Sequence, residues 1–186
     1  TSSGDHVDHA EALLLVARSA IVAGRHDLAA TAADQASASF TAQHRLGWSA
    51  AADALALESR LRLQRVDRDD FERALAIADS ADDDGFHELA VDARLLAADI
   101  AAALGEWKEC RTVIAGFDAE PDGLAARFRL EHLRAQLAVA TGERRLAAAR
   151  CIAALDEFGE LVAALGGTEM RANVAVHADR IAALGL

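Results

Sequence analysis

Three glycines, Gly24, Gly105 and Gly142, hold the same place in a pattern that recurs along the chain. Each follows an apolar stretch with helical spacing and precedes polar residues and a second stretch of the same kind. Small residues recur where two antiparallel helices must approach closely, and a glycine can end the first helix in a left-handed turn. The pattern therefore predicts helical hairpins, and no other feature of the sequence constrains the fold as much.

The spacing of these glycines indicates internal repeats. Gly105 and Gly142 are 37 residues apart, and Gly24 and Gly105 are 81 apart, about two such periods. The unit between them, residues 46–82, has a longer connection and no turn glycine. We expect four hairpins and a closing helix in one domain over residues 1–186. The expected helices span 6–23, 26–43, 46–64, 69–82, 86–104, 107–117, 123–141, 144–165 and 169–184.

The composition favours an all-α fold. Alanine, the best helix former, is the commonest residue, whereas aromatic residues make up only 4% and proline occurs once. Asp5 and Asp84 stand near the expected starts of the first and fifth helices, where an acidic side chain can cap the free N–H groups.

The charge balance excludes some partners. The formal net charge is -11, so a nucleic-acid backbone or an anionic membrane surface is not the expected partner. No apolar stretch approaches the roughly 20 residues of a membrane span. The chain has two cysteines, too few for a disulfide framework, which predicts a cytoplasmic protein.

No motif supports catalysis, a cofactor or a metal site. Cys110 and Cys151 fall on the small-residue faces of their hairpins, where a buried thiol behaves as a small, inert hydrophobe. The acidic run at residues 79–85 fails the calcium-loop pattern, because Ser80 and Val91 stand at its first and last ligand positions. We therefore expect no catalytic, cofactor-binding or metal-binding residue, and hence no enzyme.

His177 is the histidine that most resembles a functional residue. It lies in an apolar stripe with Met170, Val174, Ile181 and Leu184, whose spacing follows one face of a helix. We interpret His177 as a packing residue of the closing helix. The stretch DHVDH near the start could hold a metal loosely, but we interpret it as a solvated first helical turn.

The hairpin pattern resembles the tetratricopeptide repeat, whose period is about 34 residues. The tail LGGTEMRANVAVHADRIAALGL, residues 165–186, resembles the segment that joins helical repeats to the caspase-like peptidase domain in CHAT proteins of high-GC bacteria. These resemblances imply a right-handed superhelix of four hairpins closed by a C-terminal capping helix. They also imply a non-catalytic interaction and regulatory module excised from a longer protein, whose peptidase domain would begin beyond Leu186.

The partner implied by the resemblance is a protein or peptide, including the chain's own downstream peptidase domain. The alternative is a stand-alone scaffold, or the sensor region of a repeat-containing transcriptional regulator. In tetratricopeptide-like stacking, the first helix of each pair lines a concave surface. Its mixture of charged, polar and leucine residues suits an extended peptide or a partner helix, although these groups could also simply face water. The candidates are Glu11, Leu14, Arg18, Asp92, Leu95, Asp99, Arg129, His132 and Gln136.

Overall fold

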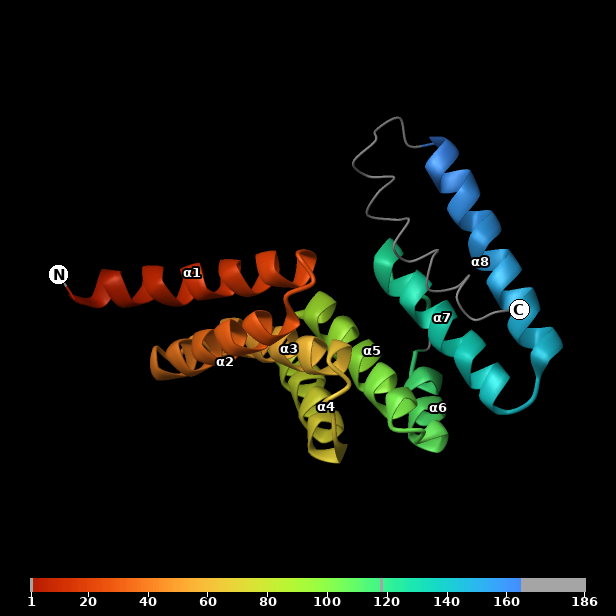
Figure 1. Ribbon diagram of the computed structural model, residues 1–186, viewed down its shortest axis with the longest axis horizontal. Helices are drawn as coiled ribbons and strands as arrows, with labels where there is room; N and C mark the ends of the chain where they lie inside the picture. Colours follow the sequence, from red (N-terminus) through yellow and green to blue (C-terminus); the bar gives the residue numbers. More distant parts are fainter. Residues whose placement is uncertain (1, 118, 165–186) are drawn as a thin grey trace. The chain divides into compact units, whose positions relative to one another are not determined.

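The computed structural model describes residues 2–117 and 119–164, and within them all regular structure is α-helical (Figure 1). This confirms the all-α fold. Eight of the predicted helices correspond to observed ones to within a few residues at each end, and the ninth, 169–184, lies outside the described residues. The helices are α1 (Ser2–Val22), α2 (His26–Ala42), α3 (Leu46–Arg62), α4 (Arg68–Asp83), α5 (His87–Ala103), α6 (Trp107–Ala115), α7 (Leu124–Ala140) and α8 (Arg144–Ala164).

The chain divides into two compact units, Thr1–Leu104 and Gly105–Leu186. The single domain predicted over residues 1–186 stays a prediction.

The predicted left-handed turns at Gly24, Gly105 and Gly142 are confirmed, with φ of +68°, +75° and +82°. An added Cβ would meet nothing within 4 Å at these glycines, so the backbone conformation alone favours glycine there. Where the sequence offers no glycine, after α2 and α3, His44 and Gln64 take up the same conformation, with φ of 56° and 55°. This conformation costs a residue with a Cβ roughly 1 kcal/mol or more of conformational free energy.

Small residues allow α1, α2 and α3 to pack closely in the first unit. Ala17, Ala33 and Ala56, one from each helix, belong to one buried cluster. The hydroxyl oxygens of Ser37 and Ser49 lie 3.1 Å apart and satisfy each other between α2 and α3. Because these residues are small, the backbones of α2 and α3 approach each other closely, and α3 packs mainly against α2.

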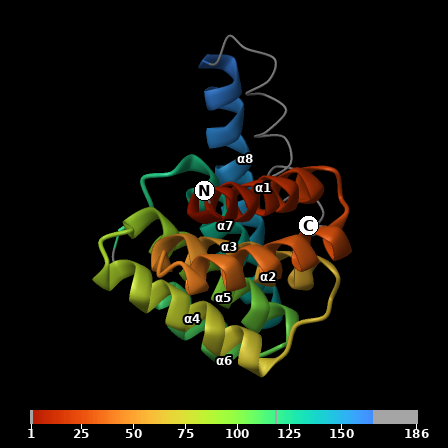
Figure 2. The ribbon, with the colours of Figure 1, turned by 90° about the vertical axis from the view of Figure 1, so that its left-hand side faces the viewer.

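The hairpin predicted from residues 46–64 and 69–82 is wrong, because these two helices are not each other's main partners. α3 packs mainly against α2, and α4 packs mainly against α5 (Figure 2). The buried residues of α4, Phe71, Ala74 and Ile77 among them, lie on its apolar side. An amphipathic pattern predicts which face of a helix is buried, but it does not predict which neighbour buries it.

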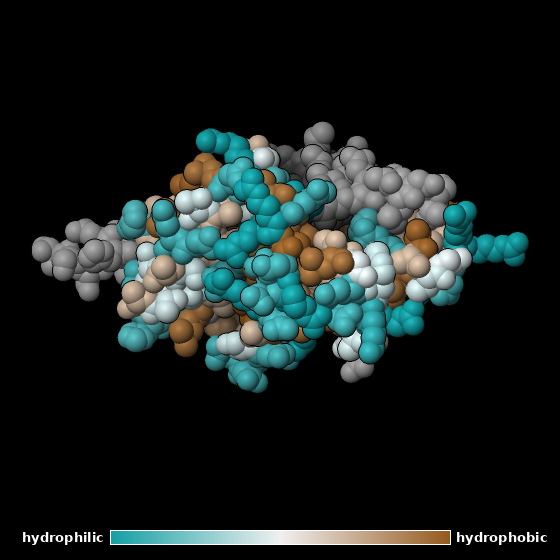
Figure 3. All heavy atoms as spheres, turned by 60° about the horizontal axis from the view of Figure 1, so that its bottom comes forward, coloured by the Kyte–Doolittle hydropathy of each residue, from teal (hydrophilic) through white to brown (hydrophobic). Residues whose placement is uncertain are grey.

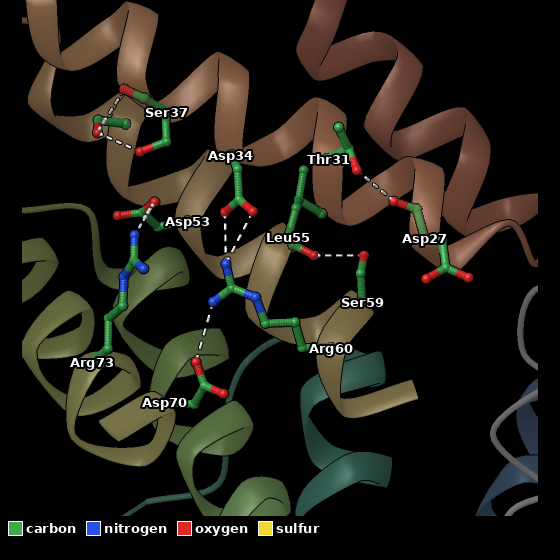
Figure 4. Close-up of polar contacts among 11 residues, drawn as sticks. Asp27, Thr31, Asp34, Ser37, Asp53, Leu55, Ser59, Arg60, Asp70 and Arg73 are labelled. Atoms are coloured by element: carbon green, nitrogen blue, oxygen red, sulfur yellow. Dashed lines mark hydrogen bonds and ion pairs between the residues drawn. The ribbon is translucent and has the colours of Figure 1, made fainter. Parts of the chain in front are cut away.

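Ion pairs connect α3 to α4 and α2 (Figure 4). Arg60 donates two hydrogen bonds to Asp34 of α2, at 2.8 and 3.0 Å, and one to Asp70 of α4, at 3.2 Å. Arg73 of α4 donates to Asp53 of α3 at 2.6 Å. Burial alone would lower the pKa of Arg60, but the two carboxylates outweigh it and raise that pKa. The guanidinium therefore stays charged and holds three helices together.

The predicted caps differ from the observed ones. Asp5 lies inside α1, and Asp84 forms the C-cap of α4, while the N-cap of α5 is Phe86 with no side-chain hydrogen bond. A capping box, which the sequence analysis missed, begins α4. There Asp67 accepts from the Asp70 N–H at 3.0 Å, and Asp70 accepts from the Asp67 N–H at 3.3 Å.

In the second unit, α7 and α8 run side by side in opposite directions, joined by the turn at Gly142 (Figure 1). Phe128 and Ala135 of α7 pack with Cys151 and Ala154 of α8 in a buried cluster. α6 packs on α7 as well, so α7 has a neighbour on each of two sides.

Candidate partner-binding groove

The nine residues predicted to form one concave face lie on three helices. α1 and α5 of the first unit carry six of them, and α7 of the second unit carries the other three. Two of the nine are wrong: Leu14 is 2% exposed and Leu95 is 0% exposed, so neither can contact a partner. Leu14 instead packs in a core cluster with Phe40 of α2 and Ala52 of α3.

The remaining seven candidates are at least partly exposed, and their role in binding stays a prediction. Glu11 already accepts a hydrogen bond from Arg45 at 2.9 Å, so its charge is engaged within the first unit.

A groove of about 370 Å³ lies between α6, α7 and the start of α8. The left-handed turn at Gly142 brings α8 back along α7 and so forms one end of this groove. Its lining consists of Arg111, Ile114, Ala115, Phe117, Arg134, Leu137, Ala138, Thr141, Glu143, Leu146 and Arg150. The lining therefore combines apolar side chains with one threonine, three arginines and one glutamate.

Glu131 of α7 fixes two of the three arginines. One of its carboxylate oxygens accepts from Arg134, one turn along the same helix, and the other accepts from Arg150 of α8 at 3.0 Å. Two guanidinium groups share one carboxylate, so this trio keeps a positive charge. The third arginine, Arg111, is exposed and makes no ion pair within the described part of the chain.

The two units differ in charge. Residues 1–104 contain nine basic and eighteen acidic residues, whereas residues 105–186 contain ten basic and twelve acidic ones. Within the second unit, basic residues gather near the groove: Arg144 and Arg145 are exposed and sit between two of its lining residues. The groove is thus a local positive site on a protein of net charge -11.

The two cysteines lie apart from this groove's lining and are buried. Burial raises the pKa of the Cys151 thiol, which favours the unreactive protonated form. Among the described residues, no group of three or more His, Cys, Asp or Glu side chains is placed to hold a metal ion. No described helix is long and apolar enough to span a bilayer.

Residues 52–182 match the family model of the sigma-54 factor core binding domain. The match covers well over half of the chain and includes every residue that lines the groove. The chain belongs to the sigma-54 core-binding-domain family. No characterised protein and no solved structure matches it.

This family assignment corrects the resemblance drawn from the sequence. The chain is not a tetratricopeptide-like region of a CHAT protein, and the regulatory role beside a caspase-like peptidase is wrong with it. The partner prediction that went with it, which named the downstream peptidase domain and excluded nucleic acid, is corrected as well, because the matching family is the core binding domain of a sigma factor. The small-residue pattern misled because any close antiparallel helix pair requires it, whatever its family.

The lining residues Arg111, Leu146 and Arg150 were not predicted from the sequence. A signal for them was present, because the acidic excess of the chain falls almost entirely on residues 1–104. Counting charge separately for each half would have shown that the second half holds more than half of the basic residues.

Proposed function

We propose that this chain is a non-catalytic domain that binds the core RNA polymerase. The observation that carries the proposal is the match of residues 52–182 to the sigma-54 core binding domain. The cytoplasmic location predicted from the sequence is part of the same proposal, because a partner of the polymerase must reach it there.

The groove of the second unit is the proposed contact surface. Protein interfaces combine an apolar centre with a polar rim, and arginine is enriched in them. The groove has both features, since Ile114 and Leu137 line it together with Arg111 and Arg150. Arg134 and Arg150 are already oriented by Glu131, so little side-chain freedom is lost when a partner binds.

A right-handed superhelix of stacked hairpins also remains our proposal for the arrangement of the helices. A left-handed residue follows α1, α2 and α3 alike, at Gly24, His44 and Gln64. Repeated turns of one kind are what a superhelix of stacked helices requires, and the step from α3 to α4 departs from this regularity because these helices pack on each other only slightly. Small-angle X-ray scattering of the whole chain tests this arrangement, which a scattering curve typical of a compact globule would contradict.

The function is tested by measuring binding of the fluorescently labelled chain to purified bacterial core RNA polymerase by anisotropy. We expect saturable binding that an unlabelled copy of the chain displaces. The Arg111→Glu and Leu146→Glu variants should each bind about tenfold more weakly, because each places a carboxylate in the proposed interface. Both side chains are partly or fully exposed, so neither change disturbs the core.

Arg25→Glu is the matched control, because Arg25 is an exposed arginine outside the family match and undergoes the same reversal of charge. It should bind the polymerase as the wild type does. Absence of saturable binding by the wild-type chain would refute the function. Binding that both groove variants retain in full would instead refute the groove as the contact surface.

A further inference from the structure

Three large apolar side chains are exposed at the start of α3 and the start of α5. Leu46 is 62% exposed, Trp48 is 44% exposed and Phe86 is 50% exposed; we call these three residues the aromatic patch. Single exposed apolar residues are normal on any protein, whereas a group of them marks a binding surface. On the face shown in Figure 3, apolar side chains likewise reach the surface in patches among hydrophilic ones.

The patch is contiguous because the ring of Phe86 lies directly on the backbone of Gly47. A Cβ added to Gly47 would stand 2.7 Å from Cε2 of that ring. Successive residues of a helix project about 100° apart, so the ring occupies the direction between Leu46 and Trp48. Glycine at position 47 is therefore what allows an aromatic residue from the α4–α5 turn to lie on α3.

Trp48 is held in place from its other side. Its ring centroid lies 5.6 Å from that of the buried Phe40, and the Arg45 guanidinium lies 4.6 Å from the Trp48 centroid. Arg45 is also paired with Glu11 at 2.9 Å. An exposed aromatic side chain that is already fixed loses little freedom when a partner covers it.

The surroundings of Phe86 are acidic. Asp83 and Asp84 precede it and Glu88 follows it, and all three are exposed and take part in no ion pair among the described residues. The nearby Asp82 is engaged, since it accepts hydrogen bonds from Arg94 and His87. The charge available to a partner at this patch is thus negative, as it is for the first unit as a whole.

We propose that the aromatic patch docks a basic amphipathic helix of a second protein. The apolar face of that helix covers Trp48 and Phe86, and its lysine or arginine residues face Asp83, Asp84 and Glu88. This surface lies on the first unit, whereas the groove proposed to bind the polymerase lies on the second. Leu46 and Trp48 precede the family match, and Phe86 lies within it. Charge complementarity selects a cationic partner and disfavours an acidic one or a nucleic acid.

The test uses the full chain and a synthetic helix of about 18 residues, five turns, with leucine on one face and lysine on the other. A second peptide replaces every lysine with glutamate. Fluorescence anisotropy of the labelled peptides should show saturable binding of the lysine peptide alone, weakening as salt is added. No saturable binding of the lysine peptide, or equal binding of the glutamate peptide, would overturn the proposal.

Three variants locate the binding. Phe86→Ala should weaken it about tenfold, and Gly47→Ala should weaken it too, because the new Cβ displaces the ring without removing it. The double change Asp83→Lys with Asp84→Lys should abolish it. These lysines fall at the C-terminal end of α4, where positive charge is favourable, so this variant folds.

Asp69→Lys is the control for the charge reversal. Asp69 is exposed at the opposite end of α4, about 20 Å from Asp83 by the rise of a helix, well beyond the screening length at physiological salt. It should bind the lysine peptide almost as the wild type does. Asp69→Lys changes the net charge by half as much as the Asp83, Asp84 variant. A loss of binding free energy in Asp69→Lys of half that of the double variant or more would show attraction to net charge alone and would overturn the proposed site, as would full binding by Phe86→Ala. Circular dichroism confirms that each variant is folded.

Discussion

Replacing a glycine with alanine should have opposite effects at two positions of the second unit. Gly142 has φ of +82° and Gly159 lies inside α8, and an added Cβ meets nothing within 4 Å at either. A left-handed conformation costs a residue with a Cβ roughly 1–2 kcal/mol. Alanine also has less conformational freedom than glycine in the unfolded chain, and this difference stabilises the folded state by about 0.4–1 kcal/mol. Gly142→Ala should therefore lower the free energy of unfolding by about 0.5–1 kcal/mol, whereas Gly159→Ala should raise it by about the same amount.

The assay is urea unfolding followed by tryptophan fluorescence. The chain has two tryptophans, Trp48 in the first unit and Trp107 in the second, so a Trp48→Phe background makes the signal report on the second unit alone. The two alanine variants should differ in the free energy of unfolding by about 1–2 kcal/mol. Because the alanine Cβ would meet no neighbouring atom within 4 Å at either position, packing cannot produce this difference. A shift of both variants in the same direction would refute the assignment of the effect to backbone conformation.

The remaining predictions concern three other residues. Gln64→Gly should stabilise the first unit by about 0.5 kcal/mol, because it removes the left-handed strain at a residue with a Cβ; a lower urea midpoint would contradict this. Hydrogen bonds from Arg94, and secondarily from His87, lower the pKa of Asp82. The Asp82 carboxylate therefore stabilises the fold fully at pH values above the ordinary aspartate pKa near 3.9, and this stabilisation is lost as the pH falls through the pKa of the folded state. Wild type should therefore melt above Asp82→Asn at pH 6 and match it at the acid limit, and a constant gap at all pH values would contradict the pairing. The Cys151 thiol, whose pKa burial raises, should react with Ellman's reagent slowly in the native protein and rapidly in urea, and equal rates would show that it is accessible.

The positions of the helices could be predicted from the sequence because local chemistry sets them. Glycine favours a left-handed turn wherever it ends a helix, and Gly24, Gly105 and Gly142 all do so. The turn at Gln64 could not be predicted, because nothing in a glutamine indicates a positive φ. It adopts that conformation since the surrounding helix packing outweighs a local cost of roughly 1 kcal/mol.

The pairing of the helices and the binding surface could not be predicted in the same way. The choice of α2 rather than α4 as the main neighbour of α3 depends on small residues that are distant in the sequence, such as Ala33. Arg60 bonds to both neighbours and does not decide between them. Leu14 and Leu95 were assigned to a surface by their distance from a turn glycine, a rule that holds only in one kind of repeat. The structure places both leucines in the core.

The two surfaces that we propose have opposite polarity and are carried by different units. The groove presents Arg111 and Arg150, and Asp83 and Asp84 lie beside the aromatic patch. Complementary surfaces on one molecule create a risk of head-to-tail association between copies, which would occupy both sites. The net charge of -11 opposes that association, because two copies of like net charge repel each other, and salt screens both this repulsion and the local attraction. The acidic excess of the first unit thus attracts a cationic partner and also gives two copies of the chain a like net charge, which disfavours their association.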